Sequence, residues 1–237
     1  MWDFFLGLTT APSGAREQTM STYARSSESW SCDACGSTML TPLFCDSCGA
    51  DYPERRGMSP FGILGIDARY DIDAEVFDEI EVQLAARLHP DKWQARGERL
   101  HKKALLAQSA VNEALEAVRG PFRRAQVLLE GLDWLEELPG GADAIRVKLP
   151  TSFLVDQLEL QEEIEEGVSA ERKKALTKQA RGELKELRAT LSDCFSALAN
   201  SSDLGQRTEL ATAIQGNVNR SRYWRNIQLS LRGSVPQ

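Results

Sequence analysis

Four of the chain's five cysteines lie in one short window, and no other feature restricts the possible fold as strongly. They form two C-x-x-C pairs nine residues apart, each followed by a glycine: Cys32, Cys35, Cys45 and Cys48. Two residues between thiolates let one tight turn direct both sulfurs at a single ion, and the glycine permits the positive φ that closes the turn. Two such turns fill a tetrahedral Zn²⁺ site, so the spacing predicts a structural zinc site without a catalytic water.

Two other uses of paired cysteines compete with structural zinc, namely a thiol redox pair and an iron–sulfur ligand set. Redox pairs usually occur singly at a strand-to-helix junction, and this stretch shows no such pattern. A segment of about 25 residues is too short for a core of its own, so metal binding is expected to supply most of its folding free energy. The fifth cysteine, Cys194, lies on the apolar stripe of a helical stretch and is expected to be an inert core residue.

A helical hairpin with a polar tip is predicted after the cysteine-rich segment. Apolar residues recur at steps of three and four through residues 77–88 and again through residues 100–118. The first helix must end at His89-Pro90-Asp91, because proline disfavours helical geometry in the residue before it, and Gly120-Pro121 ends the second. The tripeptide is therefore exposed at the tip, where an ordinary polar loop is the alternative interpretation.

In this context the tripeptide resembles the defining motif of the J domain of DnaJ-type co-chaperones. The resemblance extends to residues 61–66, similar to the first short helix of that domain, and to residues 111–114 near the end of its third helix. Residues 121–129 resemble the P-x-x-R-A-x-x-L-L signature of the HscB co-chaperones, and residues 151–164 resemble their F-L-M-E-Q-L-E-L-R-E-E-L run. The cysteine pairs are similar to those of zinc-bearing members of this family.

The resemblance implies a non-enzymatic helper of iron–sulfur cluster assembly. Its J domain is expected to stimulate ATP hydrolysis by a DnaK-type, HscA-like chaperone, while its C-terminal helices bind the IscU-like scaffold that carries the nascent cluster. The implied chaperone-binding residues are His89, Pro90, Asp91 and Lys92. The implied scaffold-binding residues are Leu154, Val155, Leu158, Glu159, Glu162, Glu166 and Tyr223. The family usually has Met at the position of Val155 and Phe at that of Tyr223.

The charge around the tripeptide departs from the family pattern. The preceding helix is usually basic, because it docks on an acidic chaperone surface. Here residues 73–88 carry five acidic side chains against Arg87 alone, and residues 92–103 carry five basic side chains against Glu98. We expect either that docking shifts toward the loop and the following helix, or that the chaperone has a different charge pattern.

The sequence as a whole predicts an all-α protein in which a zinc-ribbon-like segment precedes a J-domain helical hairpin and a C-terminal three-helix bundle. The expected organisation is a disordered lead over residues 1–29, the four-cysteine segment over 30–56, the J domain over 57–131, a linker over 132–150 and the scaffold-binding domain over 151–232.

Composition excludes several classes of partner. A net charge of −7 and a pI near 5.1 argue against nucleic acid, which needs clustered Lys and Arg. No apolar run approaches the roughly 18 residues of a membrane helix. The first residues carry an acid where a secretory signal carries basic residues, and acids occur through residues 1–29, unlike a mitochondrial presequence. We therefore expect a cytoplasmic protein, with the mitochondrial matrix as the alternative if the source is eukaryotic.

Two other functions remain alternatives at this stage. A general J-protein that binds unfolded clients is disfavoured, because the C-terminal half lacks Gly-rich and β-rich segments. A zinc-ribbon adaptor for nucleic acid or transcription machinery needs a basic or aromatic face, and residues 29–54 contain no Lys or Arg. An enzyme is not predicted, because the sequence has no nucleophile elbow and no phosphate-binding glycine loop.

Overall fold

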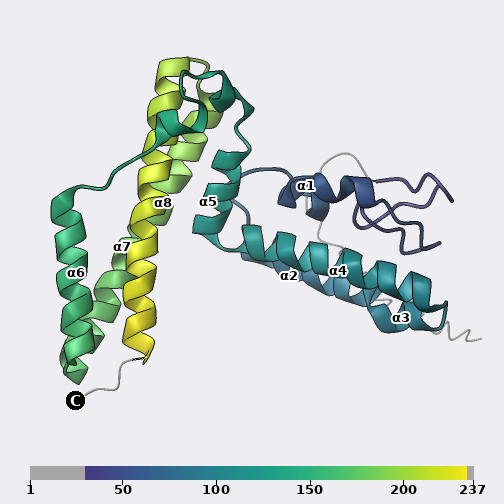
Figure 1. The fold of residues 1–237 in the computed structure, drawn as a ribbon, viewed down its shortest axis with the longest axis horizontal. Helices are drawn as coiled ribbons and strands as arrows, with labels where there is room; N and C mark the ends of the chain where they lie inside the picture. The colour runs from purple at the N-terminus through teal and green to yellow at the C-terminus, as the bar shows by residue number, and fades with distance from the viewer. Residues whose placement is uncertain (1–29, 234–237) are drawn as a thin grey trace, which may run out of the picture.

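The chain folds into two limbs joined at an angle (Figure 1). The computed structural model describes residues 30–233, so the predicted disordered lead lies outside the described residues. One limb holds the cysteine-rich segment and the hairpin, and the other holds the long C-terminal helices (Figure 1). Within residues 30–233 the structure contains helices and three isolated β-bridges but no longer strand, which confirms the all-α class.

The first limb contains four short or medium helices and one long one. They are the 3₁₀ helix η1 (Pro53–Gly57) and the α-helices α1 (Pro60–Leu64), α2 (Ala74–Leu88), α3 (Pro90–Gln94) and α4 (Glu98–Arg119). The N-cap of α1 is Ser59, whose hydroxyl accepts a hydrogen bond from the Gly62 amide at 3.2 Å. Its C-cap is Gly65, which has a φ of 66° that favours glycine. The predicted hairpin is therefore α2 and α4, with α3 at its tip.

The core of the first limb forms between α1, α2 and α4. Phe77 and Leu88 of α2 and Val118 of α4 are 1% exposed or less. Burying each such side chain contributes about 1.5–3 kcal/mol to the free energy of folding. The apolar residues of α2 and α4 therefore face this core, and their spacing in the sequence predicted the hairpin. Leu43 and Phe44 of the cysteine-rich segment belong to the same core. The segment therefore packs on the hairpin instead of standing apart from it.

The second limb is built on two long antiparallel helices. Its elements are α5 (Pro121–Glu130), the 3₁₀ helices η2 (Asp133–Glu137) and η3 (Gly141–Ile145), and the α-helices α6 (Thr151–Glu166), α7 (Ala170–Asn200) and α8 (Leu204–Gly233). The predicted three-helix bundle is α6, α7 and α8, and α5 also packs against α7 and α8. No helix among residues 30–233 is long and apolar enough to cross a membrane.

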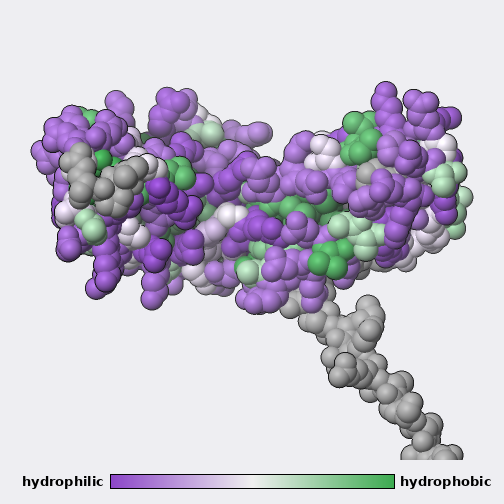
Figure 2. All heavy atoms as spheres, turned by 90° about the horizontal axis from the view of Figure 1, so that it is seen from below, coloured by the Kyte–Doolittle hydropathy of each residue, from purple (hydrophilic) through white to green (hydrophobic). Residues whose placement is uncertain are grey.

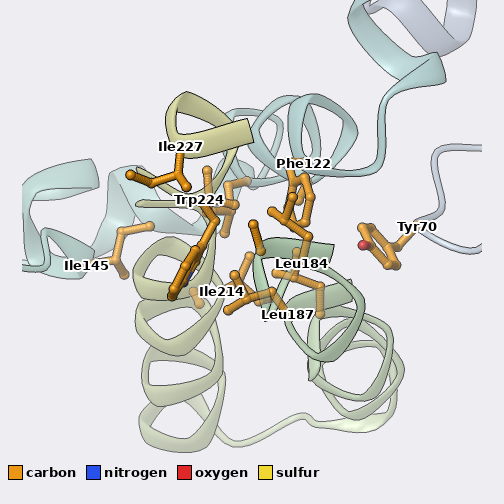
Figure 3. Packing of buried hydrophobic residues seen from close by; sticks show 14 of the residues in the cluster. Tyr70, Phe122, Ile145, Leu184, Leu187, Ile214, Trp224 and Ile227 are labelled. Atoms are coloured by element: carbon orange, nitrogen blue, oxygen red, sulfur yellow. The ribbon is translucent and has the colours of Figure 1, made fainter. Parts of the chain in front are cut away.

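Apolar side chains from nearly every element of this limb meet in one core (Figure 3). Leu187 of α7, Ile214 and Trp224 of α8 and Ile145 of η3 all point into it (Figure 3). The stretch 132–150, expected to be a linker, thus contributes buried residues to the bundle. Cys194 is half-buried at the edge of this core, and burial raises the pKa of its thiol.

The two limbs meet at a small joint of aromatic and charged side chains. Tyr70, from the loop before α2, stacks on Phe195 of α7 with ring centroids 5.0 Å apart. Arg124 of α5 is 7% exposed and donates from Nη1 to the Val118 carbonyl at 2.9 Å. Its guanidinium lies over the rings of Tyr70 and Phe77, at 5.6 and 5.3 Å from their centroids. This joint fixes the orientation of one limb relative to the other.

Candidate functional site

The four cysteine sulfurs form one cluster. All four Sγ atoms lie within 4.8 Å of one another, and the pairs Cys32–Cys48 and Cys35–Cys45 are 3.6 and 3.7 Å apart. A tetrahedron with metal–sulfur bonds of about 2.3 Å requires sulfur separations of about 3.8 Å. The predicted ligands are therefore brought together at the spacing that a four-thiolate metal site needs.

Each C-x-x-C pair closes a tight turn, which we call a knuckle: the first is residues 32–36 and the second is residues 45–49. In the first, the Gly36 amide donates to the Cys32 carbonyl at 2.8 Å, and in the second the Gly49 amide donates to the Cys45 carbonyl at 2.8 Å. The two glycines have φ values of 70° and 81°. The glycine after each pair is therefore required by the backbone conformation, as the sequence predicted.

Tyr52 is a further member of this cluster that the cysteine spacing did not reveal. Its hydroxyl accepts a hydrogen bond from the Asp33 amide at 2.8 Å and is hydrogen-bonded to Cys32 Sγ at 3.2 Å. This hydrogen bond is the main cause that lowers the pKa of Cys32, and with the backbone amides of Ala34 and Cys35 it outweighs burial, so that the pKa is about 6 and a thiolate is favoured at neutral pH. The only signal in the sequence is a hydroxyl-bearing aromatic four residues after the second pair.

Electrostatics favour a positive ion at the centre of the sulfur cluster. The amide of Ala50 lowers the pKa of Cys48, but burial and the three neighbouring sulfurs raise it more strongly, to about 12. Cys32 and Cys48 are therefore shifted in opposite directions although they are neighbours. Thiolates packed this closely repel one another, so all four ionise together only around a positive ion. The donor set and its geometry both fit a metal.

The predicted chaperone-binding residues lie together at the tip of the hairpin. His89 is the N-cap of α3, and its Nδ1 accepts a hydrogen bond from the Asp91 amide at 3.4 Å. The side chains of His89 and Asp91 are 49% and 77% exposed. Lys92 folds back so that its ammonium donates to the Ala86 carbonyl. The turn therefore presents an imidazole and a carboxylate to the solvent from a defined backbone position.

The unusual acidity of α2 is partly neutralised within the limb. Arg119 of α4 pairs with Asp78 at 3.2 Å and with Glu81 at 2.6 Å. Several of the basic residues after the turn also have partners in the chain, while Arg99 and Lys102 are exposed at the start of α4. The solvent-facing charge next to the tripeptide is therefore positive on the α4 side.

Three of the seven predicted scaffold-binding residues line a groove between α6 and α8. The groove has a volume of about 630 Å³ and is lined by Leu154 and Leu158 of α6 and by Tyr223 of α8. Val155 does not line the groove, but it is 46% exposed on α6. The carboxylates lie on the exposed side of α6: Glu159, Glu162 and Glu166.

The groove has one prominent apolar residue that the sequence did not indicate. Leu229 of α8 is 60% exposed and lines the groove with Leu158, which is 59% exposed. The two helices are held in register by Gln161 of α6, which donates to the Ser230 hydroxyl at 3.0 Å. Nothing in the sequence of α8 marks Leu229, because its role depends on the pairing of two helices far apart in the chain.

The surface around these sites is mainly hydrophilic. Figure 2 shows one face on which apolar side chains emerge only in limited patches between polar ones. Large apolar side chains that remain exposed therefore stand out, and four of the eight such side chains among the described residues lie on α6 and in the C-terminal half of α8: Val155, Leu158, Tyr223 and Leu229. Together with the carboxylates of α6 they form an apolar strip with an acidic border.

Comparison with known proteins agrees with this arrangement. Residues 149–232 match the family described as the HSCB C-terminal oligomerisation domain. The co-chaperone protein HscB homolog of Chromobacterium violaceum is 30% identical over 134 residues, which span 55% of this chain and 73% of that protein. Human co-chaperone HscB has a TM-score of 0.60 at 20% identity, covering 85% of this chain and 96% of the human chain. Chaperone HscB from Vibrio cholerae has a TM-score of 0.54 at 22% identity, and the match covers 74% of this chain and 96% of the Vibrio chain.

The solved structures establish the shared fold, including both limbs of the molecule. The sequence match to the curated relative spans most of that protein, and the domain match falls on the helices that carry the apolar strip. The chain therefore belongs to the HscB family of co-chaperones.

Proposed function

We propose that this co-chaperone binds an IscU-like iron–sulfur scaffold through α6 and α8, delivers it to an HscA-like chaperone of the DnaK type, and stimulates ATP hydrolysis through His89-Pro90-Asp91. The observation that carries the proposal is the placement of two exposed surfaces on separate limbs, with the tripeptide on one and the apolar strip on the other. A client held on one limb then reaches the chaperone at high effective concentration when the other limb docks.

The turn acts on the chaperone by binding, not by chemistry. The exposed Asp91 carboxylate is suited to charge-assisted hydrogen bonds with a cationic partner group, and the His89 ring has a second nitrogen for another contact. Binding that is tighter to the ATPase-competent state of the chaperone shifts the chaperone toward that state. The exposed Arg99 and Lys102 add positive charge for docking on the α4 side of the turn.

The apolar strip is suited to a partner surface that is basic and partly apolar. Leu158 and Leu229 offer apolar contact area, and the carboxylates of α6 steer a positively charged partner toward them. Buried apolar anchors at the centre of an interface usually carry most of the binding free energy. We expect Leu154, Leu158 and Tyr223 to be these anchors, since they line one groove.

Zinc is the metal that we propose for the sulfur cluster. Four thiolates at tetrahedral spacing are typical of structural zinc, and they fill every coordination position. When bound, the ion supplies folding free energy to the segment and leaves no site for a substrate. Metal analysis of protein purified without added metal is expected to give one zinc ion per chain, whereas iron in its place contradicts the proposal.

The stimulation step is tested by the substitution His89→Gln in the full chain. This change removes the ring whose Nδ1 caps α3, and it is expected to abolish stimulated ATP hydrolysis by an HscA-like chaperone. The matched control is His101→Gln, which alters the chain's other histidine, on α4, and should leave the stimulation within about twofold. Full stimulation by the His89→Gln variant contradicts the assignment of the turn.

The client step is tested by replacing Leu154, Val155 and Leu158 together with alanine. We expect scaffold affinity measured by calorimetry to fall by at least tenfold, while the helical circular dichroism is retained. A matched control replaces exposed apolar residues on the other limb, Val82 and Leu105, which are 68% and 44% exposed. If the triple variant instead keeps its scaffold affinity, or the chain binds unfolded proteins equally well, the client site lies elsewhere or the protein is a general J-protein.

A further inference from the structure

The second knuckle packs directly on the hairpin. The ring of Phe44, the residue before the knuckle, meets the ring of Trp93 edge to face, with centroids 4.7 Å apart and an interplanar angle of 84°. Gly49 lies so close to the hairpin that an added Cβ would come within 3.1 Å of Trp93 and 2.9 Å of Leu100. Trp93 is 3% exposed, and Phe44 is fully buried. The knuckle therefore forms one wall of the pocket that holds the Trp93 side chain.

These contacts fall on both sides of the tripeptide. Arg87, two residues before His89, pairs with Asp46 inside the second knuckle, whose side chain is only 6% exposed. On the other side, Arg96 donates to the Ser47 carbonyl at 3.2 Å, and its guanidinium lies 4.7 Å from the centre of the Trp93 ring. The second knuckle thus contacts the segment from Arg87 to Arg96 at both of its ends and also at Trp93.

The first knuckle is different, although its sequence is similar. Asp33 occupies the same position in it as Asp46 does in the second, but its side chain is 72% exposed and pairs with Arg55 of η1. A Cβ added at Gly36 would meet nothing within 4 Å. Other contacts of the first knuckle run to Tyr52 and Ser37, within the cysteine-rich segment itself. The chain therefore contains two equivalent knuckles, only one of which contacts the hairpin in this way.

We propose that the second knuckle is a positioning element for the His-Pro-Asp turn. It holds Trp93 through Phe44 and Gly49 and holds Arg87 through Asp46, so that α3 and the turn keep the geometry in which they engage the chaperone. Closure of the metal site then supports chaperone stimulation at a distance from the metal. The functional part of this proposal rests on the proposed function, whereas the structural part does not.

The short length of α3 explains why it depends on an external support. A helix of five residues has too few internal hydrogen bonds to be stable alone, so its position is set by packing. Leu88 and Trp93 are the buried residues on either side of the His-Pro-Asp turn, and the second knuckle covers Trp93. The knuckle in turn contains two of the four sulfurs of the metal cluster, Cys45 and Cys48. A bound ion joins these to the first knuckle, and losing it is expected to loosen the wall against Trp93.

The two glycines give a matched pair of variants for testing this support. Gly49→Ala and Gly36→Ala impose the same kind of backbone strain, because both glycines have positive φ and both follow a C-x-x-C pair. Only Gly49→Ala also pushes on Trp93 and Leu100. In the zinc-loaded full chain, we expect Gly49→Ala to raise amide hydrogen exchange over residues 87–96 by at least fivefold relative to Gly36→Ala, with a shift in tryptophan fluorescence.

A second pair tests the charged contact without backbone strain. Asp46→Asn weakens the pairing with Arg87, whereas Asp33→Asn changes the equivalent residue of the first knuckle, which pairs with Arg55. We expect Asp46→Asn to raise exchange over residues 87–96, and to raise severalfold the co-chaperone concentration that gives half-maximal ATPase stimulation. Asp33→Asn should leave both quantities at the wild-type level. Metal content measured on each variant confirms that all are compared in the loaded state.

The outcomes separate this proposal from the function on which it partly rests. The positioning role is overturned if amide exchange over residues 87–96 is the same in both variants of each pair. The pairs are Gly49→Ala with Gly36→Ala, and Asp46→Asn with Asp33→Asn. Increased exchange in the second-knuckle variants, with no ATPase stimulation even by the wild-type chain, supports the positioning role and contradicts the proposed function. Removal of zinc by a chelator should raise exchange over the same residues, and unchanged exchange there overturns the link to the metal.

Discussion

Tyr70 precedes α2 in the first limb, but its side chain belongs to the core of the second. Its ring is 5% exposed and stacks on Phe195 of α7, and the Arg124 guanidinium lies over the same ring, 5.6 Å from its centroid. Burial raises the pKa of the Tyr70 hydroxyl to about 12, although the positive charge of Arg124 opposes the shift. The ordinary value is about 10, so the folded and unfolded states differ in how readily this group loses its proton.

This difference predicts an alkaline weakening of the joint. Between pH 10 and 12 the unfolded chain releases the Tyr70 proton while the folded chain retains it, so the free energy of unfolding falls as the pH rises through this window. The loss attributable to Tyr70 is at most about 2–3 kcal/mol. Urea unfolding at pH 9 and pH 11 measures it, with Tyr70→Phe as the control that keeps the ring. If both proteins lose the same stability, Tyr70 does not contribute to the pH dependence.

At the residue scale, the sequence predicted what is local and missed what depends on packing. The four cysteine ligands and the exposed tripeptide follow from spacing and from the effect of proline on its neighbour, which are properties of a few adjacent residues. Tyr52, Tyr70 and Leu229 carry no such signal. Each acts across a long distance in the chain, on Cys32, Phe195 and the groove of α6 respectively.

At the element scale, the turn between α6 and α7 is stabilised at a defined helix end. The Ser169 hydroxyl accepts a hydrogen bond from the Arg172 amide at 3.2 Å, which caps the 31-residue helix α7. The Arg172 guanidinium binds both carboxylate oxygens of Glu163 at 2.6 and 2.7 Å, which lowers the pKa of that carboxyl group. These contacts join the C-terminal turn of α6 to the first turn of α7 and so help to fix the position of the apolar strip.

Loss of the cap is expected to cost a measurable part of the stability. Replacing Ser169 by alanine should lower the free energy of unfolding by about 1 kcal/mol, because the Arg172 amide loses its partner at the first turn. Ser196→Ala is the matched control, since Ser196 is exposed within α7 and alanine has the higher helix propensity there. Thermal unfolding followed by circular dichroism measures both, and a Ser169→Ala variant as stable as Ser196→Ala rules out the capping role.

Elements with sustained periodicity were predictable, and short irregular ones were not. The apolar stripes of α2, α4, α7 and α8 repeat over several turns, so their faces are visible in the sequence. The 3₁₀ helices η2 and η3 have five residues each, which is too few to show a period. Leu135 and Ile145 are nevertheless buried in the bundle core, which is a consequence of tertiary packing alone.

At the scale of the whole molecule, the joint decides whether the two limbs act as one body. Arg124 stands in the P-x-x-R-A-x-x-L-L segment that carried the family resemblance, and its position shows what the arginine does in this chain. It belongs to α5, which packs on the bundle, while its guanidinium reaches the Val118 carbonyl and the Phe77 ring of the hairpin. The relative placement of the His-Pro-Asp turn and the groove between α6 and α8 therefore depends on this buried cation together with the Tyr70–Phe195 stack.

Arg124→Ala is predicted to uncouple the limbs. The change opens a cavity at the joint and removes both ring contacts and the hydrogen bond to Val118, so we expect a loss of about 2–4 kcal/mol. The adjacent Arg123 is the matched control: its side chain is 51% exposed and pairs with Glu116 at 2.7 Å, so Arg123→Ala should cost less than about 1 kcal/mol. Calorimetry should resolve two transitions in Arg124→Ala, one for each limb, and small-angle scattering should give a larger radius of gyration. A single transition at the wild-type temperature, with unchanged scattering, places the rigidity of the joint in the Tyr70–Phe195 stack and not in Arg124.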